Sequence, residues 1–197
     1  MLSKSRKTKR IIACAVFKSI LEDLHLENRY PNLWLTYIPS KLHLHPQALK
    51  KRLWVEIVAA QKNSEMVICL YGGCFPGIDD LCQQHGVMKV PGHFCHEMIL
   101  GSERFKRLVD EVAGTYFVEK DLILNFEEYC VRPLELRDEE MRRCCFQRYR
   151  RLLYVRQASD PDLVPQAGKI AEFLGLSLGT SDADYSHLEK TLTELLR

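Results

Sequence analysis

Short apolar runs alternate with helical segments along almost the whole chain, and this alternation restricts the fold more than any other feature of the sequence. Short apolar runs, most of them with β-branched or aromatic residues, predict strands at 10–17, 33–38, 66–71, 87–90, 115–118 and 176–178. Segments with the helical spacing of apolar residues separate these runs, most clearly at 46–62 and 103–113. The run 151–156 either continues a charged helix or forms a further strand.

Strands that alternate with helices form βαβ units, which build a parallel sheet with right-handed crossovers. We therefore predict a single three-layer α/β domain over residues 10–197, with a mostly parallel, Rossmann-like doubly wound sheet. No shift in composition and no linker rich in Pro, Gly or Ser divides this range. Residues 1–9 are rich in Lys and Arg, which is typical of a flexible basic tail.

Composition and charge exclude several classes of protein. The 197 residues are 46% hydrophobic and 27% charged, as in globular proteins, and the net charge of +2 is too small to steer a charged partner. Nucleic acid is therefore not a favoured partner, although the tail and residues 148–151 are basic. No apolar run reaches the ~18 residues of a membrane span, and 11–17 is too short for a signal-peptide core. We expect a cytoplasmic protein without a membrane segment.

Residues able to bind a soft metal close or follow four of the predicted strands. Cys14 closes the first strand, and His43 follows the second. Cys74 and Cys95 follow the third and the fourth. Because the carboxyl ends of parallel strands meet at one edge of a sheet, where α/β proteins bind ligands, we expect these side chains to converge. Three thiols and one imidazole form a tetrahedral set that predicts zinc or an iron–sulfur cluster.

Four neighbouring residues extend the predicted site. Glu97 and His96 adjoin Cys95 and are candidates for acid–base catalysis, and Glu97 is also a candidate metal ligand or orienting group. Gly72 and Gly73 precede Cys74, and their backbone N–H groups are candidates for binding a cofactor or an anion.

Each candidate also has a plain structural explanation. Cysteine often packs as a small apolar residue, a histidine after a strand is commonly hydrogen-bonded within its loop, and Glu97 can face solvent. The chain has no CxxC pair, no glycine-rich phosphate motif and no GxSxG. Three classes therefore stay open: a metal-binding protein, an accessory protein without chemistry of its own, and an enzyme that uses Cys74 or Cys95 as a nucleophile.

Several short segments together resemble one family of bacterial and archaeal proteins. They are Ala13-Cys14, Leu42-His43 with Pro46, Tyr71 to Cys74 with Gly77, Pro91-Gly92, Cys95 with Glu97, Gly114-Thr115-Tyr116-Phe117, Leu136-Arg137-Asp138, and Tyr149-Arg150-Arg151-Leu152 with Tyr154, Gln157 and Asp160. From about Ile11 to Leu192 the chain is similar to the family catalogued as domain of unknown function 1638. The resemblance implies a small cytoplasmic α/β protein whose motif positions include the four predicted metal ligands and Glu97.

The resemblance also implies partners. Some members of the family are encoded beside corrinoid-dependent methyltransferases, which implies a corrinoid protein or a methyltransferase as a partner and a role near methyl transfer. Ala15 and Phe75 stand where the family usually has glycine, and His96 replaces an aromatic residue. Pro133 replaces a histidine, so no role of that histidine transfers to this chain. A homo-oligomer is compatible with the sequence.

Overall fold

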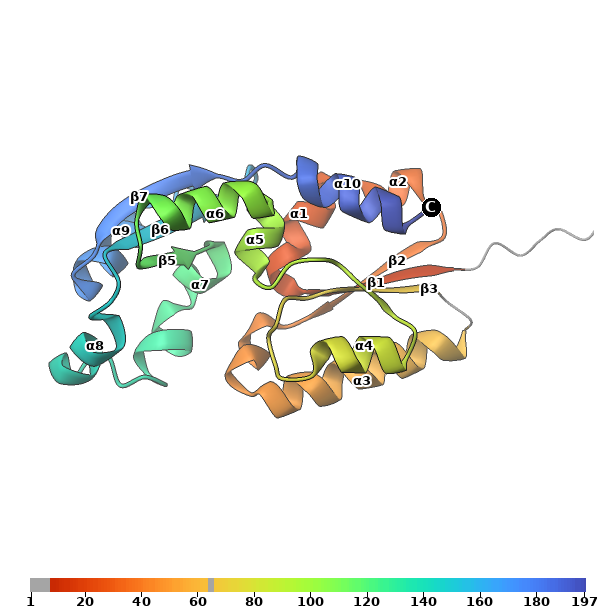
Figure 1. Cartoon of the computed structure of the whole chain (residues 1–197), viewed down its shortest axis with the longest axis horizontal. Coiled ribbons are helices and arrows are strands. Elements are labelled where there is room, and N and C mark those ends of the chain that lie inside the picture. Colours follow the sequence, from red (N-terminus) through yellow and green to blue (C-terminus); the bar gives the residue numbers. More distant parts are fainter. Residues whose placement is uncertain (1–7, 64–65) are drawn as a thin grey trace, which may run out of the picture. The chain divides into compact units, whose positions relative to one another are not determined.

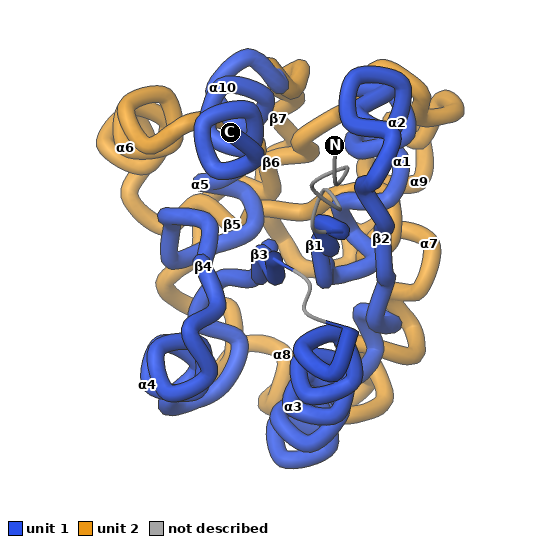
Figure 2. Tube along the Cα trace, turned by 90° about the vertical axis from the view of Figure 1, so that its right-hand side faces the viewer, with its two compact units in different colours: residues 1–98, 185–197 blue, residues 99–184 orange. Residues whose placement is uncertain are grey.

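The chain divides into two compact units, each built around its own sheet. The computed structural model describes residues 8–63 and 66–197. Unit 1 comprises the chain up to Met98 together with Tyr185–Arg197, and unit 2 comprises Ile99–Asp184 (Figure 2). Of the predicted basic tail, residues 1–7 lie outside the described residues, and Lys9 already belongs to the first strand.

Unit 1 contains a parallel sheet of four strands in the order β2-β1-β3-β4 (Figure 2). The strands are β1 (Lys9–Cys14), β2 (Leu33–Ile38), β3 (Met66–Leu70) and β4 (Met88–Lys89). The central strand β3 and the part of β1 from Ile11 onwards are continuous apolar runs because helices cover both of their faces. The register places Cys14 beside Ile38 and Ala13 beside Leu70, so the strands end level with one another.

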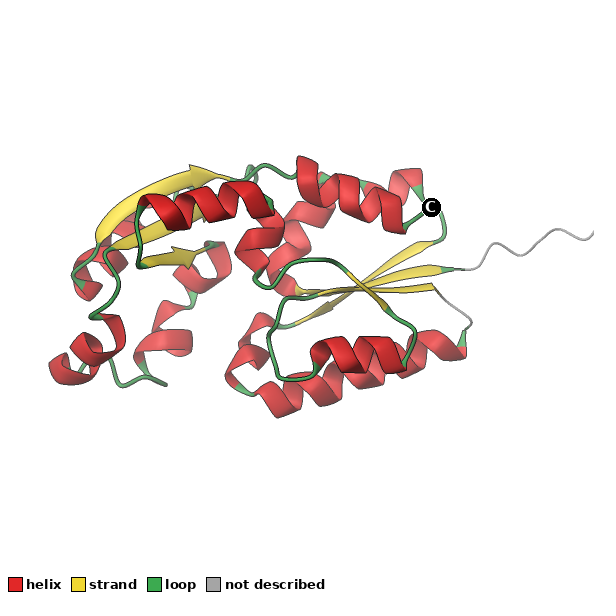
Figure 3. Ribbon diagram, in the orientation of Figure 1, coloured by secondary structure: helices red, strands yellow, loops and turns green. Residues whose placement is uncertain are grey.

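Helices lie on both sides of this sheet, which gives unit 1 three layers (Figure 3). α3 and α4 cover one face, and α1 and α10 cover the other. The bounds of the helices that cover these faces or adjoin the sheet are α1 (Lys18–Asp23), α2 (Leu26–Arg29), α3 (Pro46–Lys62), α4 (Ile78–Gln84) and α10 (Ser186–Leu195). The 3₁₀ turns η1 (Ala15–Phe17) and η2 (Ser40–Leu44) follow β1 and β2 directly. The chain passes from unit 1 to unit 2 within α5 (Cys95–Leu100).

Unit 2 contains a parallel sheet of three strands in sequential order. The strands are β5 (Thr115–Val118), β6 (Arg151–Arg156) and β7 (Ser177–Asp182). α6 (Ser102–Glu111) lies on one face, and α9 (Val164–Leu174) and α7 (Lys120–Leu124) lie on the other (Figures 1 and 2). A π-helical turn, η3 (Glu127–Val131), and α8 (Glu139–Phe146) complete the segment between β5 and β6.

The prediction of parallel sheets flanked by helices is confirmed. The run 151–156, which the sequence left open between helix and strand, is the central strand of unit 2. The expected single sheet is replaced by two, because β4 is only two residues long and the next strand, β5, pairs with β6. Among the described residues, no helix has the length and apolar character needed to cross a membrane.

Candidate functional site

The carboxyl edge of the unit 1 sheet brings together the loops that follow β1, β2, β3 and β4. All the residues predicted for a site lie at the ends of these strands or in the segments that directly follow them, as expected for parallel strands. The backbone N–H of Gly73 donates to the carbonyl oxygen of His93 at 2.8 Å, which joins the loop after β3 to the loop after β4. The edge is therefore a connected surface with several thiol and imidazole groups.

Cys14 and His43 are two predicted ligands whose side chains lie close together. Cys14 closes β1 and is 2% exposed, whereas His43 is exposed on η2. The Cys14 Sγ lies 3.8 Å from the His43 Nε2, within reach of a weak hydrogen bond. The pair arises because β1 and β2 end level, and the 3₁₀ turn after β2 then returns the chain towards β1.

Tyr71 lies beside this pair and carries a buried hydroxyl group. Its ring centroid is 6.5 Å from that of His43 in an edge-on arrangement, and its side chain is 1% exposed. Burial raises the pKa of the Tyr71 phenol far above its usual value, and negative charge on Cys14 or Cys74 would raise it further. Within the described residues its hydroxyl oxygen has no hydrogen-bond partner. Burying a hydroxyl group without a hydrogen bond costs free energy.

Gly72 and Gly73 are required by the packing of the two loops. A Cβ atom at Gly72 would overlap the carbonyl oxygen of His93, and a Cβ atom at Gly73 would lie 2.7 Å from the His93 Cε1. Close approach of a second loop therefore accounts for both glycines. The predicted role in cofactor binding stays a prediction.

Burial raises the pKa of the adjacent Cys74 thiol, although hydrogen bonding to the Gly72 backbone lowers it in part. A raised pKa reduces the thiolate fraction and disfavours Cys74 as a nucleophile.

The first turn of α5, which follows the loop after β4, carries the remaining predicted residues. The Cys95 Sγ lies 3.6 Å from the His96 Nδ1, and burial lowers the pKa of His96 to about 4. His96 is therefore neutral at pH 7, which suits a ligand or a proton acceptor better than a proton donor. A Glu97 carboxylate oxygen accepts a hydrogen bond from the backbone N–H of His93 at 2.8 Å. Glu97 thus holds the turn into α5, and the predicted catalytic roles of His96 and Glu97 stay predictions.

The predicted shell of three thiols and one imidazole is not assembled around one point. In residues 8–63 and 66–197, no group of three His, Cys, Asp or Glu side chains is placed to hold a metal ion. The Cys14 and His43 pair is nevertheless compatible with two ligands of one zinc ion. Typical zinc–ligand distances at a tetrahedral angle separate the sulfur and nitrogen atoms by roughly 3.5 Å, and the observed distance is 3.8 Å.

A buried polar network at the carboxyl edge of the unit 2 sheet was missed by the sequence analysis. The Asp160 side chain is fully buried. It accepts hydrogen bonds from the Tyr154 hydroxyl at 2.7 Å and the Gln157 backbone N–H at 2.9 Å. Its other oxygen lies 3.2 Å from the Lys120 Nζ. A cleft of about 410 Å³ opens beside it, lined by Arg156, Gln157, Ala158, Asp160, Asp182 and Ala183.

Glu119 belongs to the same edge and begins α7. Its carboxylate accepts the backbone N–H groups of Asp121 at 2.6 Å and Leu122 at 2.9 Å. Burial nevertheless raises the pKa of Glu119 to about 7, because desolvation outweighs those two hydrogen bonds. Glu119 directly follows the predicted strand 115–118, so the strand-end rule that selected Cys14 and Cys74 would have found it if carboxylates had been included.

These observations define an α/β protein with parallel sheets in two units and a thiol–imidazole pair at a sheet edge. Residues 37–192 match the family described as "Protein of unknown function (DUF1638)". The chain therefore belongs to this family, as its short motifs predicted. The match includes His43, Cys74 and Cys95, and Cys14 precedes it. No curated protein and no solved structure matches the chain.

Proposed function

We propose that the carboxyl edge of the unit 1 sheet binds a metal ion through Cys14 and His43, and that the ion is zinc. The observation that carries this proposal is the 3.8 Å pair of Cys14 and His43 beside the buried Tyr71 hydroxyl. One thiol with one imidazole favours zinc over an iron–sulfur cluster, which cysteine thiolates usually hold. Cys74 and Cys95 are the proposed source of further ligands, which requires their loops to move towards the pair.

The side chains at this edge support metal binding more directly than they support a particular reaction. When bound, zinc with an open position supplies a Lewis acid that activates a water or a thiol. In the protein itself, the neutral His96 and the carboxylate of Glu97 are the proposed groups for proton transfer near that position. A link to corrinoid-dependent methyl transfer remains part of the proposal and rests on the family resemblance alone.

Metal analysis of the full chain, purified without oxygen, tests the proposal. We expect about one zinc per chain and no visible colour, and less than about a tenth of an equivalent in Cys14→Ser and His43→Ala. Cys145→Ser is the matched control, since Cys145 lies on α8 in unit 2, and it should keep its zinc. If the analysis finds iron and labile sulfide instead, the bound group is an iron–sulfur cluster and not zinc. A metal-free wild-type protein that also fails to bind added zinc would refute the proposal.

The second candidate is a binding protein that recognises a methyltransferase or a corrinoid protein through the same edge. Exposed apolar side chains favour it: Phe94 is 52% exposed and Leu44 is 37% exposed, and each directly adjoins a predicted ligand. Exposed apolar residues beside a site are common where a partner docks. None of the eight cysteines, all of which are described, forms a disulfide, which suits the proposed cytoplasmic location.

Titration with a purified corrinoid protein separates the two candidates. Under the second candidate, Phe94→Ser weakens the complex about tenfold or more, whereas Cys14→Ser leaves it intact. Trp54→Ser is the control, because this exposed aromatic residue lies on α3 and not at the edge. Equal binding by wild type and Phe94→Ser would contradict a docking role for this edge.

A further inference from the structure

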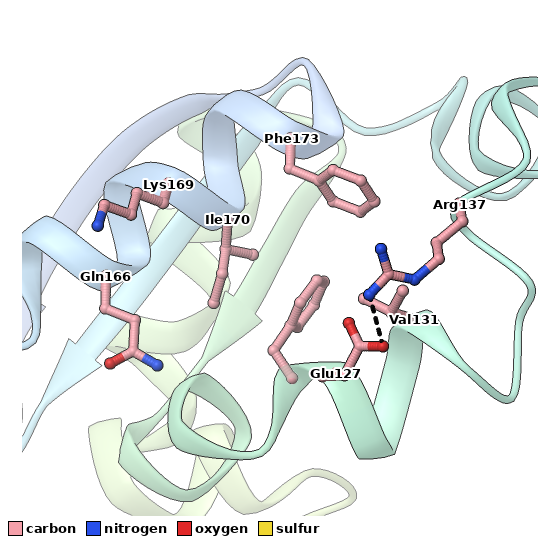
Figure 4. A pocket seen from close by; sticks show the side chains of 8 residues that line it. Glu127, Val131, Arg137, Gln166, Lys169, Ile170 and Phe173 are labelled. Atoms are coloured by element: carbon pink, nitrogen blue, oxygen red, sulfur yellow. Dashed lines mark hydrogen bonds and ion pairs between the residues drawn. The ribbon is translucent and has the colours of Figure 1, made fainter.

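A cleft in unit 2 has an apolar interior and a positively charged rim. It has a volume of about 290 Å³ and lies between the segment that follows α7 and the helix α9 (Figure 4). Its lining residues are Phe126, Glu127, Val131, Arg137, Gln166, Lys169, Ile170 and Phe173. The site proposed for zinc lies in unit 1 and shares none of these residues.

The apolar residues of the cleft set the size and shape of a ligand. Phe126, Val131 and Ile170 are at most 7% exposed, so they form fixed walls, and Phe173 is 36% exposed at the opening. An engineered apolar cavity of about 150 Å³ is known to bind benzene. A cleft of about 290 Å³ therefore has room for one ring, or a short branched chain, with a small polar group attached.

The charged residues of the cleft determine which polar group a ligand would carry. The Arg137 guanidinium donates to Glu127 at 2.9 Å, and Arg132 also pairs with Glu127 at 3.4 Å. Arg137 lowers the pKa of the Glu127 carboxyl, with a smaller effect of Arg132, so Glu127 is ionised and its charge offsets that of Arg137. Lys169 adds a further positive charge at the rim, although its ammonium group points away from the cleft in Figure 4.

The Arg137 guanidinium has N–H donors beyond the one that Glu127 uses. A guanidinium carries five N–H donors in a planar fork, and one of them is used by Glu127. Figure 4 shows Arg137 extending along the cleft towards Glu127, close to Phe173 and Val131. A carboxylate on an apolar ligand can therefore meet Arg137 while its apolar body contacts the walls.

We propose that this cleft binds a small carboxylic acid with an apolar body, such as an arylacetic or a short branched-chain acid, and that Arg137 binds its carboxylate. The wall residue Val131 and the carboxylate that orients Arg137 both belong to the π-helical turn η3. Its Arg132 N–H donates to the Glu127 carbonyl oxygen at 3.0 Å, five residues back. Single π-helical turns occur frequently at functional sites, which agrees with a binding role for this segment.

Calorimetric titration of the full chain with three probes of one shape tests the proposal. Phenylacetate carries the required charge, phenylacetamide is neutral, and phenethylamine is positively charged. We expect phenylacetate to bind in the millimolar range and about tenfold more tightly than phenylacetamide, because one charge-assisted bond to Arg137 distinguishes them. Phenethylamine should not bind. Equal affinity for the three probes, or no binding of phenylacetate, would overturn the proposal.

Three variants locate the binding. Arg137→Met should lower the affinity for phenylacetate about tenfold and leave that for phenylacetamide unchanged. Phe173→Ala should weaken both probes, since it removes one wall. Arg132→Met is the matched control: Arg132 pairs with the same carboxylate but does not line the cleft, so its affinities should stay within about twofold of wild type. Unchanged phenylacetate binding in Arg137→Met would refute the assigned role. This outcome is independent of the zinc content of unit 1.

Discussion

The buried carboxyl group of Glu119 makes the stability of unit 2 depend on pH in a direction opposite to that of most carboxylates. Glu119 is 5% exposed, and burial raises its pKa from 4.5 to about 7 in the folded chain. Between these values the folded state holds a proton that the unfolded state has released. The free energy of unfolding therefore falls as the pH rises through this window. Stability from this group is fully present below pH 4.5 and lost at about pH 7.

The magnitude follows from the size of the shift. One pKa unit corresponds to about 1.4 kcal/mol, so the shift from 4.5 to about 7 is worth about 3 kcal/mol. Glu119→Gln removes the titration. It also leaves one oxygen to accept two backbone N–H groups, which costs about 1 kcal/mol at every pH. Wild-type stability should therefore rise by about 3 kcal/mol relative to the variant as the pH falls from 8 to 4.5.

Urea unfolding at several pH values measures this difference. Both tryptophans, Trp34 and Trp54, lie in unit 1, so unit 2 must be followed by far-UV circular dichroism or by hydrogen exchange of α7. A ¹³C titration of the Glu119 carboxyl carbon gives its pKa directly. Parallel stability curves for wild type and Glu119→Gln, or a carboxyl pKa near 4.5, would show that the two hydrogen bonds outweigh burial.

Three further substitutions test other parts of the structure. Tyr71→Phe should raise the stability of metal-free unit 1 by about 1 kcal/mol, measured by tryptophan fluorescence in urea, because it removes a buried hydroxyl for which the described residues offer no hydrogen-bond partner; a loss of stability would reveal a partner. Gly72→Ala should lower the free energy of unfolding by about 2–3 kcal/mol, because the added methyl group overlaps the neighbouring loop. At Gly168 on α9 a methyl group fits without overlap, so Gly168→Ala should be neutral or stabilising. Lys120→Met should lower the free energy of unfolding by about 3 kcal/mol, because it removes the ion-pair partner of the fully buried Asp160 carboxylate. Arg132→Met removes an exposed ion pair and should lower it by less than about 0.5 kcal/mol. Equal losses of stability, measured by circular dichroism, would contradict this ranking.

Most secondary structure could be predicted because local patterns determine it. The β-branched runs gave the first three strands within a few residues, and Pro46 at a first helical turn located α3. The division into two sheets could not be predicted, since strand pairing is not encoded in apolar periodicity. The π-helical turn η3 could not be predicted either, since it depends on packing rather than on local propensity.

The candidate site could be predicted only in part. The strand-end rule correctly placed Cys14 and His43 at one edge, because the register of β1 with β2 is set by the apolar pattern. It could not reveal that Gly72 makes room for a neighbouring loop, which depends on a contact between segments far apart in the sequence, or that the Glu97 carboxylate accepts a hydrogen bond from the His93 backbone, which depends on the turn between them. The Glu119 network was missed because the search at strand ends considered thiols and imidazoles first, and Glu97 entered only as a neighbour of Cys95.

The order of the chain through the two units has a consequence for synthesis on the ribosome. Unit 2 is a continuous segment, whereas unit 1 needs residues from both sides of it. Its last helix, α10, joins the earlier part of unit 1 through the Arg29–Glu189 ion pair at 2.8 Å and a hydrogen bond from Lys9 to the Leu196 carbonyl oxygen. The emerging chain therefore exposes apolar surface of unit 1 until unit 2 has been made. Unit 2 can fold during that delay, and chaperone binding before residue 185 should concentrate on the first segment.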